Sequence, residues 1–324
     1  MKESDATRGP LKTTVLFLVY NRPDVTSRVF EAIRRAKPPR LYVAADGPRE
    51  GRSGEAQRVA RVREIATAVD WPCEVKTLFR DQNLGCKYAV SSAITWFFEQ
   101  EEQGIILEDD CMPHSDFFSF CETLLDRYRD DDRVSVITGD NFQDGQWRGE
   151  CSYYFSRYNH VWGWASWRRA WNQYDGELSF WPEWKQSAEW ITHLPVRIER
   201  KNWEKIFDRT HAKKIDSWAY PWTASVWFHG GLTATPNVNL VSNIGFGADS
   251  THTTNPNDAN ANRPSAPLGK LIHPSEIRRD IDADSYTFDY AFGGKAQRFP
   301  ASLISFPRRV GGSLYRELRK ALCI

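Results

Sequence analysis

The chain has 324 residues, with 43 Lys and Arg against 42 Asp and Glu, and a formal net charge of +1. This length suits one large domain or two modest ones with a substantial core. The near-neutral charge gives no indication of nucleic acid as a partner. The six cysteines show neither CxxC pairs nor zinc-type spacing, which favours reduced thiols in a cytoplasmic protein.

Strand and helix patterns alternate through the first 140 residues. Apolar runs predict strands over residues 15–20, 41–45, 73–79, 105–107 and 134–138. Between them, apolar stripes at helical spacing predict helices over residues 25–36, 55–69, 85–100 and 116–128. Such alternation needs crossover connections, so we expect an α/β fold with a mainly parallel sheet.

The second half has a different character, because most of the 14 tryptophans lie between Trp147 and Trp227. Short strands are expected over 233–236 and 239–241, followed by a polar loop over 251–262. We assign one domain to residues 12–262, with halves 12–141 and 142–262, and a C-terminal extension to 263–324. The 12 N-terminal residues are polar and no apolar run reaches membrane-spanning length.

The apolar run 105–107 ends directly in three carboxylates, Glu108, Asp109 and Asp110. Adjacent carboxylates repel each other, and a divalent cation with oxygen ligands neutralises such a group. A solvated acidic turn is the alternative. The buried strand before the triplet favours the cation site, since ligands of doubly wound sheets bind at the carboxyl ends of strands.

Polar residues follow every one of the five predicted strands of the first half. They are Asn21 and Arg22, then Asp46, then Arg80, Asp81, Asn83 and Gly85, then the acidic triplet, then Gly139, Asp140 and Asn141. We expect these groups to meet in one crevice at the sheet edge. No GxGxxG follows the first strand and no GxxxxGK[ST] occurs, which argues against a Rossmann dinucleotide site and a P-loop.

Four motifs follow one another along the chain in an order that resembles the GT-A glycosyltransferases. They are NRPD after the first strand, ADGP after the second strand, FRDQNLG with the helix that follows it, and IILEDDCMPHSDFF. The similarity is to bacterial family-2-like enzymes and to the inverting N-acetylglucosaminyltransferase I type, over roughly residues 13–255. It implies a GT-A fold, which is Rossmann-like and mainly parallel, with an aromatic-rich helical acceptor half. It also implies transfer of a hexosyl or N-acetylhexosaminyl group from a nucleotide-diphosphate donor to a hydroxyl.

The resemblance also assigns roles on the donor side. It makes Asp110 the ligand of Mn²⁺ or Mg²⁺, places Asp109 at the ribose or sugar, and makes Glu108 a supporting acid. The remaining donor-binding residues would be Asn21, Arg22, Asp46, Arg80, Asn83 and Gly85, with Asp46 at the nucleobase. A histidine, His252, matches a C-terminal metal ligand found in part of the family, and a surface loop histidine is the alternative.

The family also has a C-terminal acid that serves as the catalytic base, and Asp216 is its positional match. As a base, this carboxylate would take the proton of the acceptor hydroxyl in a single inverting displacement. The alternative is a helix N-cap, because Asp216 precedes an apolar segment over 218–228. Both roles are compatible with one another.

Rings are dense over residues 158–167, beside the expected carbohydrate site. We assign Trp162 and Trp164, together with Asp140 and Asn141, to the acceptor side of the crevice. The alternative is a helix that packs Trp164, Trp167 and Trp171 into the core.

The sequence thus predicts a metal-dependent glycosyltransferase whose partners are a nucleotide-sugar donor and a glycan or lipid-linked glycan acceptor of envelope polysaccharide. The alternatives are a sugar nucleotidyltransferase and a catalytically inactive binding module on the same fold. A nucleotidyltransferase would need a Gly-rich, Lys-bearing loop after the first strand, where this chain has Asn21-Arg22-Pro23-Asp24. The basic, leucine-striped segment 301–324 predicts an amphipathic helix, either on the inner face of the cytoplasmic membrane or docked on the domain.

Overall fold

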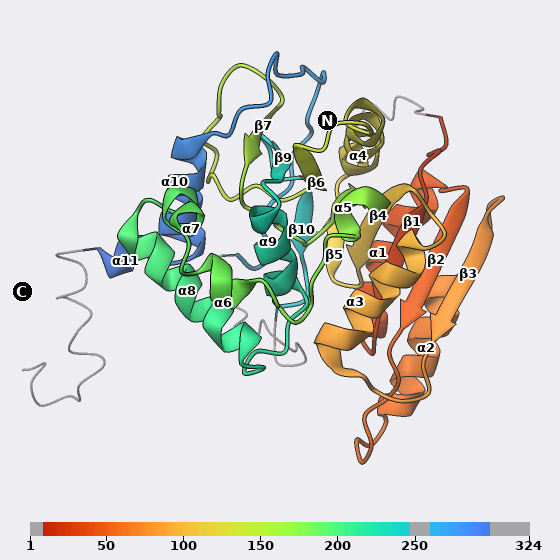
Figure 1. Ribbon diagram of the computed structural model, residues 1–324. Helices are drawn as coiled ribbons and strands as arrows, with labels where there is room; N and C mark the ends of the chain where they lie inside the picture. Colours follow the sequence, from red (N-terminus) through yellow and green to blue (C-terminus); the bar gives the residue numbers. More distant parts are fainter. Residues whose placement is uncertain (1–8, 247–259, 299–324) are drawn as a thin grey trace, which may run out of the picture.

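The computed structural model describes residues 9–246 and 260–298 of the chain (Figure 1). Its strands are β1 (Val15–Val19), β2 (Arg40–Ala45), β3 (Glu74–Phe79), β4 (Gln103–Glu108), β5 (Cys111–Pro113), β6 (Val134–Thr138), β7 (Tyr153–Ser156), β8 (Trp164–Trp167), β9 (Leu232–Pro236) and β10 (Val241–Asn243). Eight of them form one sheet in the order β3-β2-β1-β4-β8-β6-β9-β7, and β10 pairs with β5 in a second, small sheet.

The helices differ in length between the two halves of the chain. The first half has α1 (Pro23–Ala36), α2 (Glu55–Thr67), α3 (Gly85–Phe98) and α4 (Ser115–Arg127). The second half has α5 (Arg168–Trp171), α6 (Trp181–Trp184), α7 (Ala188–His193), α8 (Arg197–His211), α9 (Ala219–Phe228), α10 (Ile281–Ala291) and α11 (Gly294–Gln297). None of the described helices is both long and apolar enough to cross a membrane.

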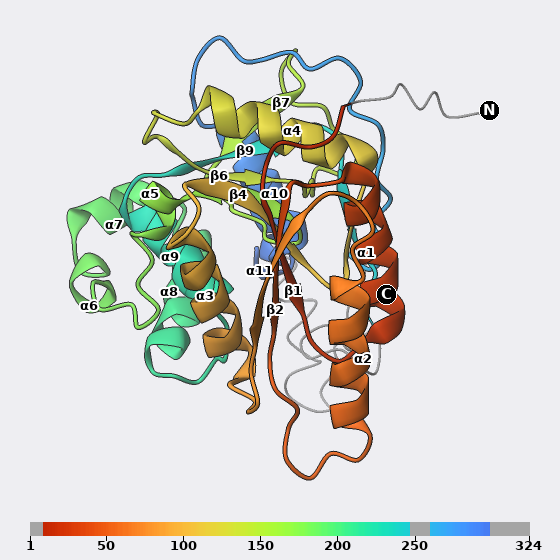
Figure 2. The same cartoon turned by 90° about the vertical axis from the view of Figure 1, so that its right-hand side faces the viewer.

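The large sheet lies between two layers of helices, which Figure 2 shows with α1, α2 and α4 on one side and α3 with α5–α9 on the other. A separate hydrophobic cluster fills each side of the sheet. Strand β1 is covered by helices on both faces and is buried along its whole length. A strand covered in this way is apolar at every position, which explains its continuous apolar sequence. The apolar runs over 15–20, 41–45, 105–107 and 134–138 are therefore inner strands of the sheet, whereas the predicted strand 73–79 is the edge strand β3.

The predicted α/β class with a mainly parallel sheet is confirmed. Strand β1 pairs in parallel with both β2 and β4, and β2 pairs in parallel with β3. The exceptions are β8, which runs antiparallel to β4 and β6, and β7, which runs antiparallel to β9. Because both halves contribute to one continuous sheet, residues 12–141 and 142–246 form a single structural unit.

The ring-dense segment forms a strand where the alternative reading expected a helix. Trp164 and Trp167 lie on β8, in the middle of the sheet, and only the short helix α5 follows. Trp164 packs against Trp218 with 5.7 Å between ring centroids and against Trp222 with 5.8 Å. The core location expected for these rings is correct, although the helical geometry is wrong, because pairing with β4 and β6 imposes extended backbone there.

Residues 263–298, the described part of the expected C-terminal extension, pack against the main sheet. The backbone N–H of Asp280 donates to the carbonyl of Phe155 on β7 at 2.7 Å, and Phe288 of α10 is buried among the rings of the second half. The basic helix expected over 301–324 lies outside the described residues.

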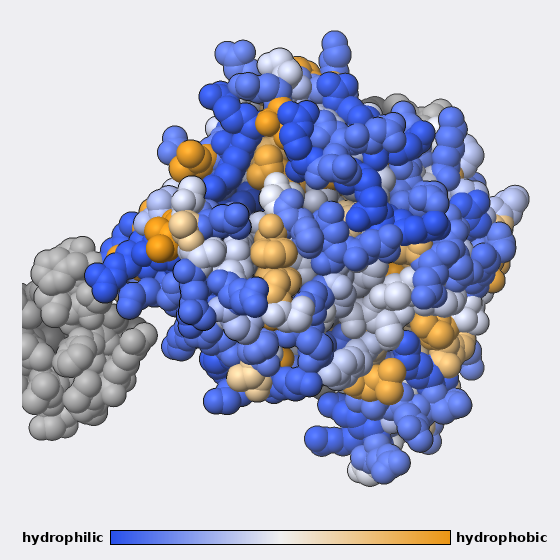
Figure 3. Space-filling view, in the orientation of Figure 1, coloured by the Kyte–Doolittle hydropathy of each residue, from blue (hydrophilic) through white to orange (hydrophobic). Residues whose placement is uncertain are grey.

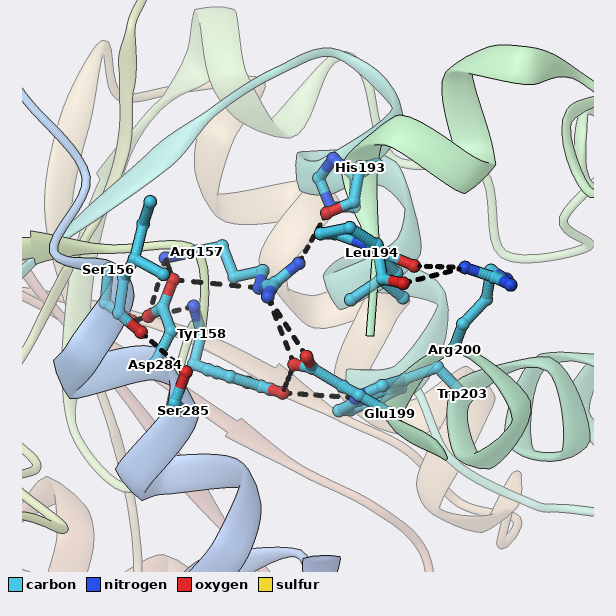
Figure 4. Close-up of polar contacts among 12 residues, drawn as sticks. Ser156, Arg157, Tyr158, His193, Leu194, Glu199, Arg200, Trp203, Asp284 and Ser285 are labelled. Carbon is cyan, nitrogen blue, oxygen red and sulfur yellow. Dashed lines mark hydrogen bonds and ion pairs between the residues drawn. The ribbon is translucent and has the colours of Figure 1, made fainter. Parts of the chain in front are cut away.

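A buried ionic network fastens this segment to the second half (Figure 4). The guanidinium of Arg157, which is 4% exposed, lies 3.2 Å from a carboxylate oxygen of Glu199 on α8 and 3.6 Å from one of Asp284 on α10. Arg157 also donates to the carbonyl of His193 at 2.6 Å, and Tyr158 donates to Glu199. Burial raises the pKa of Glu199, while the charge of Arg157 opposes that rise.

The face of the molecule in Figure 3 is largely hydrophilic, with small and separate apolar patches.

The seven tryptophans that are fully buried account for much of the ring density seen in the sequence: Trp164, Trp167, Trp181, Trp190, Trp203, Trp222 and Trp227. Most of the tryptophans thus stabilise the core of the second half.

Replacement of Glu199 by Ala is expected to reduce the free energy of unfolding by about 3–5 kcal/mol, because the buried guanidinium of Arg157 loses a partner. Urea denaturation followed by circular dichroism measures the loss. Glu189→Ala, an exposed acid on the neighbouring helix α7, is the matched control and should change stability by less than about 0.5 kcal/mol. Equal stability of the two variants would contradict this account of the network.

Candidate active site at the carboxyl ends of the parallel strands

The acidic triplet at the end of β4 faces the arginine that follows β1. Arg22 forms an ion pair with Asp109 and lies 3.0 Å from a carboxylate oxygen of Asp110. The backbone N–H of Tyr20 also donates to Asp109 at 3.2 Å. Parallel pairing of β1 with β4 brings the two strand ends together, so two segments that are remote in sequence share one cluster.

The segment after β10 closes over this cluster. The N–H of Ile244 donates to the carbonyl of Asp110 at 2.8 Å, and Gly245 packs against the Asp110 carboxylate and the Arg22 guanidinium. A Cβ at position 245 would collide with the Asp110 carboxylate, so the contact requires glycine. Asp110 and Asp109 are consequently buried, with 7% and 3% of their surface exposed.

Burial controls the charge of the triplet. Burial and the negative charges of Asp110 and Asp109 raise the pKa of Glu108 to about 8. Burial also raises the pKa of Asp109 to about 6, although the charge of Arg22 opposes that rise. The side chain of Glu108 makes no hydrogen bond or ion pair with the described residues, and the residue is half-buried. The cluster therefore carries more carboxylate groups than its single guanidinium neutralises.

The N-terminus of helix α3 is capped by two carboxylates from distant parts of the chain. Asp46, after β2, accepts from the backbone N–H groups of Leu84 at 3.0 Å and Gly85 at 3.2 Å. Asp216 accepts from the N–H of Lys87 at 3.0 Å. Negative charge is favourable at a helix N-terminus, which explains why both acids are held there. The expected cap on 218–228 is wrong, because α9 has no side-chain cap and Asp216 caps α3.

Gly85, the first residue of α3, lies close to the carboxylate of Asp216. Its φ of +78° lies in the left-handed region, and a Cβ there would stand 3.2 Å from the second carboxylate oxygen of Asp216. The carboxylate of Asp216 thus lies over the start of α3 with one oxygen bonded to the backbone, and Asp216 is exposed.

A second set of ion pairs supports the position of Asp216. Lys87 on α3, which is buried, donates to Glu177 at 2.7 Å, and Lys213 lies 2.9 Å from the other oxygen of Glu177. These pairs connect α3 to the segment that carries Asp216. They hold the exposed carboxylate beside the helix start.

The three groups of acids meet around Cys86, the second residue of α3. Burial, together with the negative charges of Glu108, Asp216 and Asp46, raises the pKa of the Cys86 thiol to about 12. Asp46 and Asp216 contact the backbone on either side of Cys86, and the charge of Glu108 acts on the same thiol. A shared crevice at this edge of the sheet stays a prediction.

A buried glutamate that we did not single out in the sequence organises the β1 side. Glu55, at the start of α2, is fully buried and accepts from the side chains of Asn21 at 2.9 Å and Tyr20 at 3.1 Å, and it pairs with Arg49 at 2.6 Å. Asn83 donates to Tyr20 Oη at 3.1 Å. Asn21 and Asn83 therefore use their side chains for internal bonds. In the sequence, Glu55 is indistinguishable from a solvated acid at a helix start.

The other predicted donor-side residues lie at the edge of this region. Arg80, which follows β3, donates to Ser92 on α3 at 2.6 Å, and its charge acts on Asp46. His252 lies outside the described residues, so its predicted metal contact stays a prediction.

The residues assigned to the acceptor side divide into two groups. Trp164 is fully buried, and Asn141 bonds internally to Asn239 and to the carbonyl of Pro236, so both are structural. Trp162 remains a candidate for acceptor contact, whereas Asp140, at 1% exposed, lies beneath it. Asp140 accepts from the backbone N–H of Trp162 at 3.0 Å, and its other oxygen has no hydrogen-bond partner among the described residues. Burial raises the pKa of Asp140 to about 7.

Trp162 is half-buried and belongs to a row of rings that begins beside the acidic cluster. Its ring lies 5.8 Å from that of Phe246, the residue after Gly245, and 5.4 Å from that of Phe142. Phe142 contacts His160 at 4.4 Å. Rings of this kind offer apolar faces to the C–H surfaces of a sugar.

The triplet has the oxygen chemistry of a site for Mg²⁺ or Mn²⁺, although the described residues contain no ready-made group of three metal-ligating side chains. Mg²⁺ is often held by one or two carboxylates together with substrate phosphates. The surplus of carboxylates over guanidinium at the end of β4 fits a cation held in that way. Asp110 and Glu108 are the side chains that would hold it.

Comparisons with known proteins identify no family. No protein-family model matches the chain, and no curated protein matches it either. Among solved structures, HddC from Yersinia pseudotuberculosis is similar at 11% identity and a TM-score of 0.31, over 53% of this chain and 86% of that one. A CMP:2-keto-3-deoxy-manno-octonic acid synthetase complexed with CTP is similar at 15% identity and a TM-score of 0.37, over 69% and 89%.

A UDP-glucose pyrophosphorylase complexed with UDP-glucose is similar at 10% identity and a TM-score of 0.25, over 45% of this chain and 62% of that one. These identities and TM-scores are too low to transfer a function. The functional reading of this chain therefore depends on the geometry of its own residues.

The Glu55 cluster makes a prediction about acid stability. Hydrogen bonds from Arg49 lower the pKa of Glu55 to about 2, from an ordinary value of 4.5. A lowered pKa in the folded state stabilises the protein above pH 4.5, and this contribution is lost as the pH falls towards 2. We expect Glu55→Gln to be less stable at pH 7 and to lose less stability between these two pH values.

Urea titrations at a series of pH values measure this dependence. Glu64→Gln, which removes an exposed acid that pairs with Arg61 on the same helix, is the control and should follow the wild type. A Glu55→Gln variant with the full acid dependence of the wild type would refute the role of Glu55.

Proposed function

We propose that this protein is an enzyme that acts on a nucleotide-diphosphate sugar and transfers the sugar to a hydroxyl acceptor with inversion. The observation that carries the proposal is the convergence of Asp46, Glu108 and Asp216 around Cys86, beside the Asp109–Asp110 pair. In open α/β sheets, ligands bind at the carboxyl ends of the strands, and this edge carries these acids. The resemblance to GT-A glycosyltransferases supports the same assignment.

On the donor side, the protein offers fixed groups at three strand ends. Asp46 is held by the start of α3 and is the candidate contact for the nucleobase. Arg22 is the cation of this edge nearest to the acidic cluster and is the candidate contact for the diphosphate. Both belong to loops that the parallel sheet positions, so the donor would lie across the ends of β1, β2 and β4.

On the acceptor side, Asp216 is the candidate general base. One of its oxygens is bonded to the N–H of Lys87, which fixes the carboxylate, and the exposed side chain can reach a substrate hydroxyl. The base would take the proton of that hydroxyl as the oxygen attacks the anomeric carbon and the nucleoside diphosphate departs. The half-buried Trp162 would contact the sugar to which the hydroxyl belongs, and the buried Asp140 would hold the backbone of Trp162 in place.

A divalent cation held by Asp110 and Glu108 would act as a Lewis acid that offsets negative charge on the diphosphate. An envelope glycan or a lipid-linked glycan is our proposed acceptor class, by the same resemblance.

A sugar nucleotidyltransferase is the second candidate, because two of the similar structures are a CMP:2-keto-3-deoxy-manno-octonic acid synthetase and a UDP-glucose pyrophosphorylase. Both names match this alternative more closely than they match glycosyl transfer, although the similarity is low. Against it, the loop after β1 carries Arg22 and Pro23 and lacks the Gly-rich, Lys-bearing sequence that such an enzyme would need. Product analysis separates the two reactions.

Isothermal titration with UDP, GDP, TDP and CMP, each with and without Mn²⁺, tests the donor site. We expect one nucleotide to bind in a metal-dependent way and the binding to be lost in Asp110→Asn, because a neutral amide is a poor ligand for a hard cation. Incubation with the matching nucleotide-diphosphate sugar should then release the nucleoside diphosphate as the sugar passes to an added acceptor hydroxyl or to water. Formation of pyrophosphate from a nucleoside triphosphate and a sugar 1-phosphate would instead establish the nucleotidyltransferase, and no binding at all would favour an inactive module.

Asp216→Asn tests the base separately from the cap. The amide oxygen of Asn can still accept from the N–H of Lys87, but the side chain cannot take a proton. We expect kcat for sugar transfer to fall by about 10²–10⁴-fold, with the nucleotide Kd unchanged. Asp216→Ala should show the same loss of turnover and, in addition, reduced thermal stability. Full turnover by Asp216→Asn would assign the base to another residue.

A further inference from the structure

Arg22 places its positive charge beside the carboxylates that a metal ion would bind. Its guanidinium lies between Asp109 and Asp110, at 3.0 Å from Oδ2 of Asp110, and also donates to the carbonyl of Gly245 at 3.4 Å. The other oxygen of Asp110 is next to the thiol of Cys111, at 3.4 Å in the buried interior. Oδ2 of Asp110 therefore faces the guanidinium and Gly245, while the other oxygen faces the interior.

We propose that Arg22 is a built-in counter-ion that competes with a divalent cation for Asp110, so that the cation binds only when the guanidinium moves away. The inference concerns regulation of the metal site within the function proposed above, and it rests on that function. Competition from Arg22 makes the free protein a weak binder of the divalent cation. The cation binds strongly only when a second ligand accepts the guanidinium of Arg22.

Geometry and charge both oppose simultaneous binding. Mg²⁺ or Mn²⁺ approaches a carboxylate oxygen to about 2.0–2.2 Å, and Gly245 covers another side of the same carboxylate. A cation there would adjoin the positive charge of Arg22 at a site shielded from water, where like charges repel more strongly than in solvent. Burial disfavours the charge of Arg22, but Asp109 and Asp110 outweigh it and raise its pKa, so the residue stays cationic.

Arg22 has room to move. It occupies the N-cap position of α1, makes no side-chain cap bond to that helix, and retains 21% of its side-chain surface exposed. Rotation of the side chain therefore leaves the helix start intact, where Pro23 sets the backbone. A diphosphate is an anion that can accept the released guanidinium in a bidentate way. Binding of the anion and of the metal would then favour each other reciprocally.

The test is the binding of Mn²⁺ alone, without nucleotide, measured from the electron paramagnetic resonance signal of the free ion. Arg22→Gln removes the charge and keeps a hydrogen-bond donor beside Asp109. We expect its Kd for Mn²⁺ to be roughly 5–150-fold lower than that of the wild type, the usual range of coupling between two ligands. Arg22→Lys, which keeps the positive charge, should remain close to the wild type.

Two further variants establish specificity. Arg34→Gln removes an exposed arginine of the same helix α1 that pairs with Asp70, and it should bind Mn²⁺ as the wild type does. Asp110→Asn in the Arg22→Gln background should abolish the tightening. An unchanged Kd in Arg22→Gln, or tightening that survives Asp110→Asn, would overturn the inference.

A measurement on the wild type covers the case in which Arg22→Gln does not fold. In protein labelled with ¹⁵N-arginine, the Nε–Hε resonance of Arg22, assigned by its absence in Arg22→Lys, should shift as Mg²⁺ is added to saturation. Mg²⁺ binding without such a shift would refute the exchange. Neither assay needs sugar transfer, so the two proposals can fail separately. Competition between Arg22 and the cation in a protein that shows no turnover would support this inference and refute the proposed function. Turnover in a protein that shows no such competition would support the proposed function and refute this inference.

Discussion

The ion pairs between Arg22 and the two aspartates after β4 are the interaction on which the arrangement of the site depends. Three adjacent carboxylates, two of them buried, repel each other, and one guanidinium from the end of β1 holds Asp109 and Asp110. This contact joins the two central strands of the sheet at their carboxyl ends and gives Gly245 a surface to pack against. The surplus negative charge that remains is the physical basis for a cation at this edge.

The start of helix α3 is the second organising point. Its free backbone N–H groups attract Asp46 from the end of β2 and Asp216 from the segment before α9, and together these contacts draw the two halves of the molecule to one place. Gly85 makes the approach feasible, since a larger residue would need a strained backbone at φ +78° and would crowd the carboxylate. A helix terminus thus acts here as an assembly point for acids that the chain order keeps far apart.

Some parts of this site follow from local patterns and others do not. The strands that carry Asp46 and the triplet were predicted because fully buried parallel strands appear as unbroken apolar runs. The assignment of Trp164 to the acceptor side was wrong, because its burial follows from the insertion of β8 between β4 and β6, which depends on distant pairing. The alternative placed Trp164 in the core but on a helix, because a buried strand and a buried helix look alike in a short aromatic stretch. Glu55 was missed for a similar reason, since its bonds to Tyr20 and Asn21 arise only when α2 folds back onto β1.

The amino-acid sequence by itself determined the strand and helix order of the first half, the mainly parallel sheet and the edge at which polar groups collect, because these depend on periodicity and on the direction of parallel strands. Only the tertiary structure decided how those groups are paired: Arg22 with the aspartates, Asp216 with the N–H of Lys87, and Arg157 with Glu199. Pairing depends on distances of a few ångströms between residues that lie far apart in the chain. No local pattern carries that information, because burial and charge compensation are set by the whole packed molecule.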